Sequence, residues 1–130
     1  MKIGIVGAGG IAKKYLNSLD KIEDTEVTAV CDLVEERAEA AAKPRKAKVY
    51  TEHAEMLDQE KLDIVFICIP PGAHSTQVAD SAETVEAIFV AKPVGLDLET
   101  AIRTRDAIEK SGVINQVGYM ARYSDITEKA

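Results

Sequence analysis

The sequence predicts an α/β fold, in which a doubly wound parallel sheet of about six strands, in the order 3-2-1-4-5-6, carries helices on both faces. Three observations predict it. Short apolar runs alternate with amphipathic stretches along the 130 residues, the pattern of repeated strand–helix–strand units. A glycine-rich turn follows the first apolar run at residues 7–10, and an acidic residue, Asp32, closes the second apolar run.

The first half of the chain alternates between strands and helices. Residues 2–6 form an apolar strand, and the next helix repeats Ile11, Tyr15 and Leu19 at four-residue intervals. A second strand covers residues 27–31. The elements that follow are an alanine-rich helix at 34–42 that stops before Pro44, a short strand at 49–50 and a brief helix at 54–57.

The second half continues the alternation. The unbroken apolar run at 63–69 suits a central strand that is buried on both faces. After it we expect a helix starting near His74 and a strand at 87–91. The next helix presents its inward face through Leu98, Ala101, Ile102 and Ile108, Gly112 ends it, and the last strand covers 113–117.

Composition excludes several classes of function. The net charge is −6, and the one basic cluster, at 43–48, is interrupted and reads as a solvated loop, so we expect no nucleic-acid partner. No apolar run is long enough to cross a membrane. Cys31 and Cys68 lie far apart without metal-ligand spacing, so no metal site is expected. Free thiols in apolar strands favour a cytoplasmic protein.

The glycine-rich turn is the main candidate binding site. Gly7 suits a tight turn, Gly9 lets the backbone approach a phosphate, and Ala12 is small enough for the helix to pack on the strand. Gly10 and Ile11 complete the turn at the helix N-terminus, where free N–H groups and the helix dipole favour an anion. The turn therefore predicts a site for a dinucleotide pyrophosphate.

Asp32 predicts which dinucleotide binds. A carboxylate at the end of the second strand accepts hydrogen bonds from ribose hydroxyls and repels a 2′-phosphate, and the adjacent Leu33 brings no positive charge. This favours NAD over NADP. The alternative is that Asp32 only caps the next helix. Arg37, one turn into that helix, either reaches the adenine side or is simply solvated.

The ends of the strands should meet at one edge of the sheet. Right-handed crossovers place every loop that follows a strand on the same side. The residues concerned are Gly7, Asp32, Pro70, Lys92 and Gly118.

Taken together, these blocks resemble the N-terminal domain of the Gfo/Idh/MocA (glucose–fructose oxidoreductase / inositol dehydrogenase) family, a Rossmann fold. The blocks are the glycine turn at 7–12, Cys31-Asp32, Pro70-Pro71-Gly72-Ala73-His74, Ala91-Lys92-Pro93, and the segment 117–123. The resemblance covers nearly the whole chain. The Lys-Pro block and the Gly-Tyr-x-x-Arg-Tyr block are its more specific parts.

The resemblance implies roles for several residues. Lys92 would contact a substrate hydroxyl beside the nicotinamide and polarise it, although a lysine that merely ends a strand is the plainer alternative. The cofactor side would include Ile69, Pro70, Pro71, His74 and Pro93. Gly118 and Arg122, with Tyr119 and Tyr123, would lie near the nicotinamide end or pack against a partner domain. The family usually has Glu where this chain has Ala91, and often Thr in place of Ile69.

The expected function is that of a nucleotide-binding domain, residues 1–123, of an NAD(P)-dependent oxidoreductase acting on a sugar, polyol or related hydroxy compound. Residues 124–130, with Ser124 or Asp125 as a helix N-cap, would begin the connection to a second domain that supplies the substrate pocket. The parent protein is expected to be a homo-oligomer, and this chain alone to bind cofactor with little turnover. Two alternatives stay open: a non-catalytic NAD-sensing or protein-interaction domain, and an enzyme of another Rossmann family.

Overall fold

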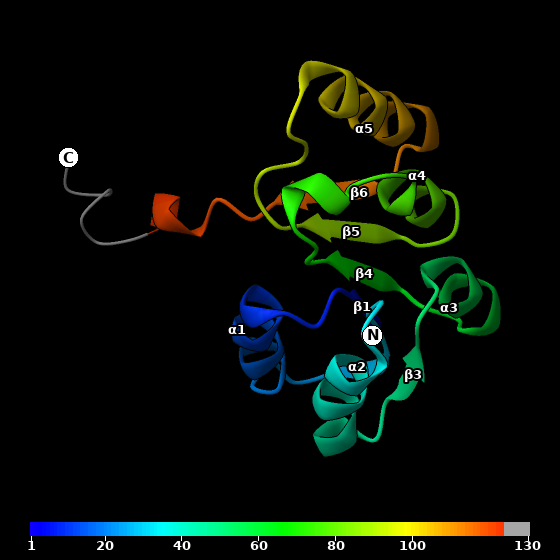
Figure 1. Cartoon of the computed structure of the whole chain (residues 1–130), viewed down its shortest axis with the longest axis vertical. Coiled ribbons are helices and arrows are strands. Elements are labelled where there is room, and N and C mark those ends of the chain that lie inside the picture. Colours follow the sequence, from blue (N-terminus) through cyan, green and yellow to red (C-terminus); the bar gives the residue numbers. More distant parts are fainter. Residues whose placement is uncertain (124–130) are drawn as a thin grey trace.

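A computed structural model describes residues 1–123. Six parallel strands form one sheet in the order β3-β2-β1-β4-β5-β6, as predicted (Figure 1). The strands are β1 (Lys2–Val6), β2 (Glu26–Cys31), β3 (Lys48–Tyr50), β4 (Ile64–Ile67), β5 (Ala87–Val90) and β6 (Ile114–Val117). The helices are α1 (Gly10–Leu19), α2 (Glu35–Ala42), α3 (His53–Gln59), α4 (Gln77–Ala82) and α5 (Leu98–Ser111).

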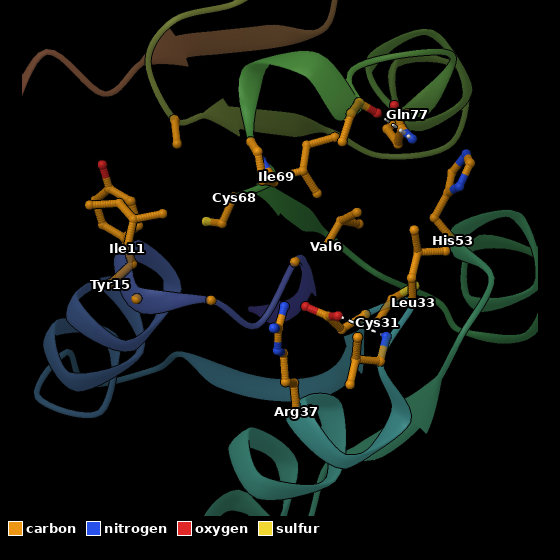
Figure 2. Close-up of a pocket in the computed structure, with 18 of the residues that line it drawn as sticks. Val6, Ile11, Tyr15, Cys31, Leu33, Arg37, His53, Cys68, Ile69 and Gln77 are labelled. Carbon is orange, nitrogen blue, oxygen red and sulfur yellow. Dashed lines mark hydrogen bonds between the residues drawn. The ribbon is translucent and has the colours of Figure 1, made fainter.

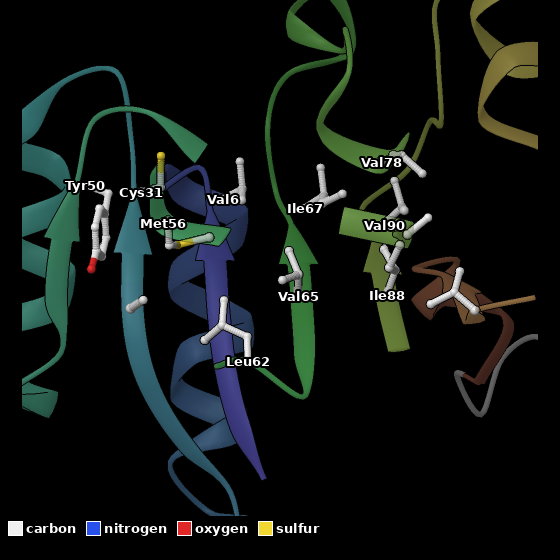
Figure 3. Packing of buried hydrophobic residues seen from close by; sticks show 13 residues of the cluster. Val6, Cys31, Tyr50, Met56, Leu62, Val65, Ile67, Val78, Ile88 and Val90 are labelled. Carbon is white, nitrogen blue, oxygen red and sulfur yellow. The ribbon is translucent and has the colours of Figure 1, made fainter. Parts of the chain in front are cut away.

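Helices cover both faces of the sheet. The chain winds outward from the centre in two directions, so right-handed crossovers place α1 and α2 on one face and α3, α4 and α5 on the other. On the first face, Ile5, Leu16 and Val30 are fully buried. On the second face, Met56 of α3 packs among strand residues that include Val65 and Ile67 (Figure 3). Burying each of these large side chains contributes about 1.5–3 kcal/mol.

The fourth helix begins later than predicted. It starts at Gln77, and a 3₁₀ turn at Pro71–Ala73 stands where the sequence placed the helix start near His74. The side chain of Gln77 explains the delay, because its Oε1 accepts a hydrogen bond from the backbone N–H of Ser75 at 2.7 Å. The Ser75 N–H would have no carbonyl partner in the first turn of a helix that began at His74, and the side-chain bond satisfies it in the non-helical conformation.

The inward face predicted for α5 is wrong at two positions. Leu98 is 75% exposed and Ile102 is 38% exposed. Ile108 packs against the core as predicted, and Thr100, which the prediction omitted, is buried. These two residues lie on one side of the helix, which misses Leu98 and Ile102. Gly112 ends the helix with φ +70°, as predicted.

The basic segment at 43–48 is more ordered than a solvated loop. The Arg45 side chain is largely buried, and its Nε donates to Asp20 Oδ1 at 2.8 Å while one Nη donates to the Ala41 carbonyl at 2.9 Å. Arg45 therefore ties the end of α1 to the end of α2. Within residues 1–123, no helix combines the length and the apolar character that a membrane crossing requires.

Candidate functional site: a cavity at the carboxyl edge of the sheet

A cavity of about 660 Å³ opens where the strands end (Figure 2). Its volume lies within the range of small-molecule and cofactor sites. Segments that follow β1, β2, β3, β4 and β5 all contribute to its wall. Its lining residues include Gly7, Gly9, Gly10, Ile11, Asp32, Leu33, Arg37, Ile69, Pro70, Pro71 and Lys92.

The glycine turn has the geometry that its sequence predicts. Gly7 has φ +90°, and a Cβ there would lie 2.8 Å from the Cys68 carbonyl oxygen, so a side chain would clash. At Gly9 and Gly10, in contrast, no atom of the described residues lies within 4 Å of an added Cβ. No side chain caps the N-terminus of α1. The turn thus presents open backbone and free N–H groups to the cavity.

Asp32 holds the turn from the neighbouring strand. Its Oδ2 accepts a hydrogen bond from the Ala8 N–H at 2.7 Å, and its Oδ1 accepts one from the Val34 N–H at 2.9 Å. The N-cap of α2 is Val34, so Asp32 forms a local turn and is not the cap residue. Each carboxylate oxygen keeps a second lone pair for a ligand. Leu33, 81% exposed, and the exposed Arg37 lie beside it on the cavity wall.

Lys92 lies on the cavity wall just after β5, and its side chain is exposed. The peptide bond between Lys92 and Pro93 is cis. The two positions that depart from the family pattern, Ala91 and Ile69, also line the cavity. Both therefore present apolar groups to the space beside Lys92.

Five of the predicted contacts do not line this cavity in the part of the chain that the structure describes: Ala12, His74, Pro93, Gly118 and Arg122. Ala12 is fully buried, which fits its predicted packing role. Gly118 is closed in by Phe89 and Tyr15, each with an atom 2.7 Å from an added Cβ. His74 lies between the 3₁₀ turn and α4, and its burial lowers the pKa of the ring. From the last segment, Met120 lines the cavity.

The two cysteines lie on the cavity wall as free thiols. Burial raises the pKa of Cys31 and of Cys68 to about 12, with smaller contributions at Cys31 from Glu52 and Asp32. Both are therefore protonated at neutral pH and form part of the apolar wall. Among residues 1–123 no group of histidine, cysteine and acidic side chains is arranged to hold a metal ion.

Sequence reasoning missed one end of the cavity. Thr51, Glu52 and His53 follow β3, and Gln77 begins α4; all four line the wall. The sequence could have predicted these residues as part of the site, because in a parallel sheet the residues that follow β3 lie at the same edge as those that follow β2. The backbone shows this directly, since the Asp32 N–H donates to the Tyr50 carbonyl at 3.1 Å.

These features fit a dinucleotide. The open backbone at Gly9 and Gly10 leaves room for phosphates at a helix N-terminus. The carboxylate of Asp32 lines the same cavity, and the rest of the wall is mainly apolar.

Comparisons with known proteins agree with this site. Residues 1–119 match the family described as "Oxidoreductase family, NAD-binding Rossmann fold" (GFO_IDH_MocA). The chain is 35% identical over 127 residues to the inositol 2-dehydrogenase/D-chiro-inositol 3-dehydrogenase of Lacticaseibacillus casei, covering 95% of this chain and 37% of that protein. It is 28% identical to the glucose-6-phosphate 3-dehydrogenase of Bacillus subtilis, covering 94% of this chain and 34% of that protein.

Solved structures show the same fold. Scyllo-inositol dehydrogenase from Lactobacillus casei, with NAD(H) and scyllo-inositol bound, superimposes with a TM-score of 0.88 at 30% identity, over 96% of this chain and 38% of that one. The WlbA dehydrogenase from Chromobacterium violaceum, with NADH and UDP-GlcNAcA, gives a TM-score of 0.92 at 26% identity, over 99% and 38%. The chain thus spans little more than a third of the length of these relatives. It belongs to the Gfo/Idh/MocA oxidoreductase family and forms that family's NAD-binding Rossmann domain.

Proposed function

We propose that this chain is the cofactor-binding domain of an NAD-dependent oxidoreductase that moves a hydride between nicotinamide and a hydroxyl-bearing carbon of a sugar or polyol. The observation that carries the proposal is one cavity that joins the open glycine turn, Asp32 and Lys92. The bound cofactor supplies the hydride acceptor or donor. Inositol and sugar-phosphate dehydrogenases among the relatives support a polyol or sugar as substrate.

Each group in the cavity has a distinct task. The free N–H groups at the start of α1 hold the pyrophosphate. Asp32 uses its remaining lone pairs to accept hydrogen bonds from the adenosine ribose, and its charge repels a 2′-phosphate. At the other end, the ammonium group of Lys92 donates to the substrate oxygen and stabilises the negative charge that develops there. The apolar groups of Ile69 and Ala91 exclude water from this end.

We further propose that the parent protein is a cytoplasmic homo-oligomer and that this chain alone turns over little substrate. The short span relative to the dehydrogenases supports the second point. Catalysis requires the substrate to be held within reach of the nicotinamide, and Lys92, which lines the cavity, is the residue to which we assign contact with the substrate oxygen.

A domain exchange tests the proposal. Residues 1–119 of this chain replace the matching segment of the L. casei inositol dehydrogenase, and inositol oxidation is followed by NADH absorbance. We expect the chimera to be active, and Lys92→Met to lower its kcat by about 100-fold or more with little change in NAD affinity. Lys110→Met, a change to an exposed lysine of α5, is the control.

The second candidate function is a non-catalytic NAD-sensing or protein-interaction domain. The apolar Ala91 and Ile69 in the cavity wall favour it, because both replace polar groups usual in the family. A chimera that folds and binds NAD but does not oxidise inositol would support this candidate and count against the enzyme. The other alternative, a different Rossmann family, is excluded by the match over residues 1–119.

A further inference from the structure

His53 lines the cavity on the side opposite Ile11 and Tyr15. Figure 2 shows His53 and Gln77 at one end, and Ile11 and Tyr15 at the other, with Leu33 next to His53. Because Asp32 marks the ribose position in the proposed function, the space beyond it, beside Leu33 and His53, is where an adenine base would lie. The inference that follows rests on that proposed function.

His53 is held in place by a carboxylate. Its Nε2 lies 2.8 Å from Oδ2 of Asp80, which links the first residue of α3 to α4. The His53 side chain is 16% exposed, so most of the ring is packed. The neighbouring amide of Gln77 is already engaged with the backbone of Ser75 and Ala73.

The pairing of His53 with Asp80 determines which ring nitrogen of His53 can accept a hydrogen bond from a ligand. An ionised carboxylate only accepts hydrogen bonds, so Asp80 places a proton on Nε2 of His53. In the neutral ring, Nδ1 then carries a lone pair and accepts. The hydrogen bond that His53 forms among residues 1–123 uses Nε2 and leaves Nδ1 available.

We propose that His53, positioned by Asp80, reads the adenine base of the cofactor by accepting a hydrogen bond from its 6-amino group at Nδ1. A hypoxanthine base has an oxygen at that position, which would face the same lone pair. The pair would therefore make this site selective for adenine over its deaminated analogue. His53 acts as the specificity-determining residue, and Asp80 acts through it as a positioning residue.

The test compares two probes, NAD and nicotinamide hypoxanthine dinucleotide, by calorimetry on the 130-residue chain. One hydrogen bond predicts that NAD binds about fivefold to tenfold more tightly. His53→Phe keeps an aromatic ring without nitrogen and should bring the ratio of the two affinities close to one. Asp80→Ala should lower the ratio partway, because the proton is then free to move between the ring nitrogens. Asp58→Asn, on the exposed side of α3, is the control and should leave the ratio unchanged.

The outcomes separate the inference from the proposed function. Equal binding of both dinucleotides, or an unchanged ratio in His53→Phe with an unchanged melting temperature, would overturn the inference alone. A purely structural role for the pair would weaken both dinucleotides equally and leave the ratio as in the unmodified chain, which would also overturn it. Binding of neither probe would overturn the proposed function and the inference with it.

Discussion

Oδ2 of Asp32 accepts a hydrogen bond from the backbone N–H of Ala8 at 2.7 Å. This bond joins the end of β2 to the middle of the glycine turn after β1. The residue proposed to recognise the ribose therefore also fixes the loop proposed to hold the phosphates. In the proposed site, cofactor selectivity and the geometry of the glycine turn therefore depend on the same carboxylate.

Asp32→Asn should weaken NAD binding and narrow the preference for NAD over NADP. The substitution removes the charge that repels a 2′-phosphate and leaves one carbonyl oxygen where two carboxylate oxygens now accept. Losing charge-assisted hydrogen bonds predicts a rise in the Kd for NAD of about 10- to 100-fold. Calorimetry with both cofactors checks this, with Glu36→Gln on the exposed side of α2 as control. An unchanged ratio of the two affinities would contradict the role given to Asp32.

Gly7→Ala should lower the stability of the fold, whereas Gly9→Ala should lower NAD affinity and leave stability unchanged. At Gly7, φ is +90° and the new methyl group would meet the Cys68 carbonyl at 2.8 Å, so the free energy of unfolding should fall by about 1–3 kcal/mol. At Gly9 the methyl group meets no described atom, so the melting temperature should hold while NAD affinity falls. Thermal melts and NAD titrations on both variants check this. Unimpaired NAD binding by Gly9→Ala would show that the phosphates lie elsewhere.

Cys31 and Cys68 should react slowly with alkylating reagents in the native protein. Burial raises the pKa of each thiol to about 12, so very little reactive thiolate exists at pH 8. Iodoacetamide labelling, followed by mass spectrometry, should be far slower in buffer than in concentrated urea. Rapid labelling of either cysteine in buffer would contradict the buried, protonated state.

The ionised carboxylate of Glu60 should stabilise the β3–α3 region at neutral pH, and this contribution should be lost in acid. The carboxylate accepts hydrogen bonds from Lys48 Nζ and from the Tyr50 hydroxyl, each at 2.6 Å, and these lower the pKa of Glu60. A lowered folded-state pKa gives stability that is present above the ordinary carboxyl pKa and is lost as the pH falls through the folded value. Because Lys48 is mostly exposed, the Tyr50 bond carries most of the effect.

Urea unfolding of Glu60→Gln at pH 7 and pH 3 checks this prediction. The variant should lose about 1–2 kcal/mol at pH 7 and less at pH 3, because pH 3 lies below the ordinary carboxyl pKa, where the contribution of the Glu60 charge to stability declines. Glu39→Gln, an exposed change on α2, should show no such difference. An equal loss at both values of pH would mean that the Glu60 charge does not contribute.

Much of the architecture could be predicted because it depends on local patterns. The apolar run that becomes β4, the glycine turn and the Gly112 helix end each follow from short segments, and strand order then follows from crossover handedness. Most of the predicted cofactor contacts that follow β1, β2 and β4 reach one cavity for the same reason, Ala12 and His74 being the exceptions.

The rest depends on contacts between distant segments. No local pattern shows that Arg45 binds Asp20, or that His53 meets Asp80 across two helices. The start of α4 was misplaced because no local pattern shows that a 3₁₀ turn at Pro71–Ala73 and a side-chain bond from Gln77 to Ser75 precede the helix. Leu98 and Ile102 were misplaced because hydrophobicity alone did not reveal which stripe of α5 faces the sheet.

The most direct test of the account is a calorimetric titration of this chain with NAD and with NADP under identical conditions. We predict one NAD site per chain and binding of NADP that is at least about tenfold weaker, because the proposed site sets the carboxylate of Asp32 against the ribose. Absence of NAD binding by the folded chain would contradict the proposed site, and equal affinity for the two cofactors would contradict the role of Asp32 in it.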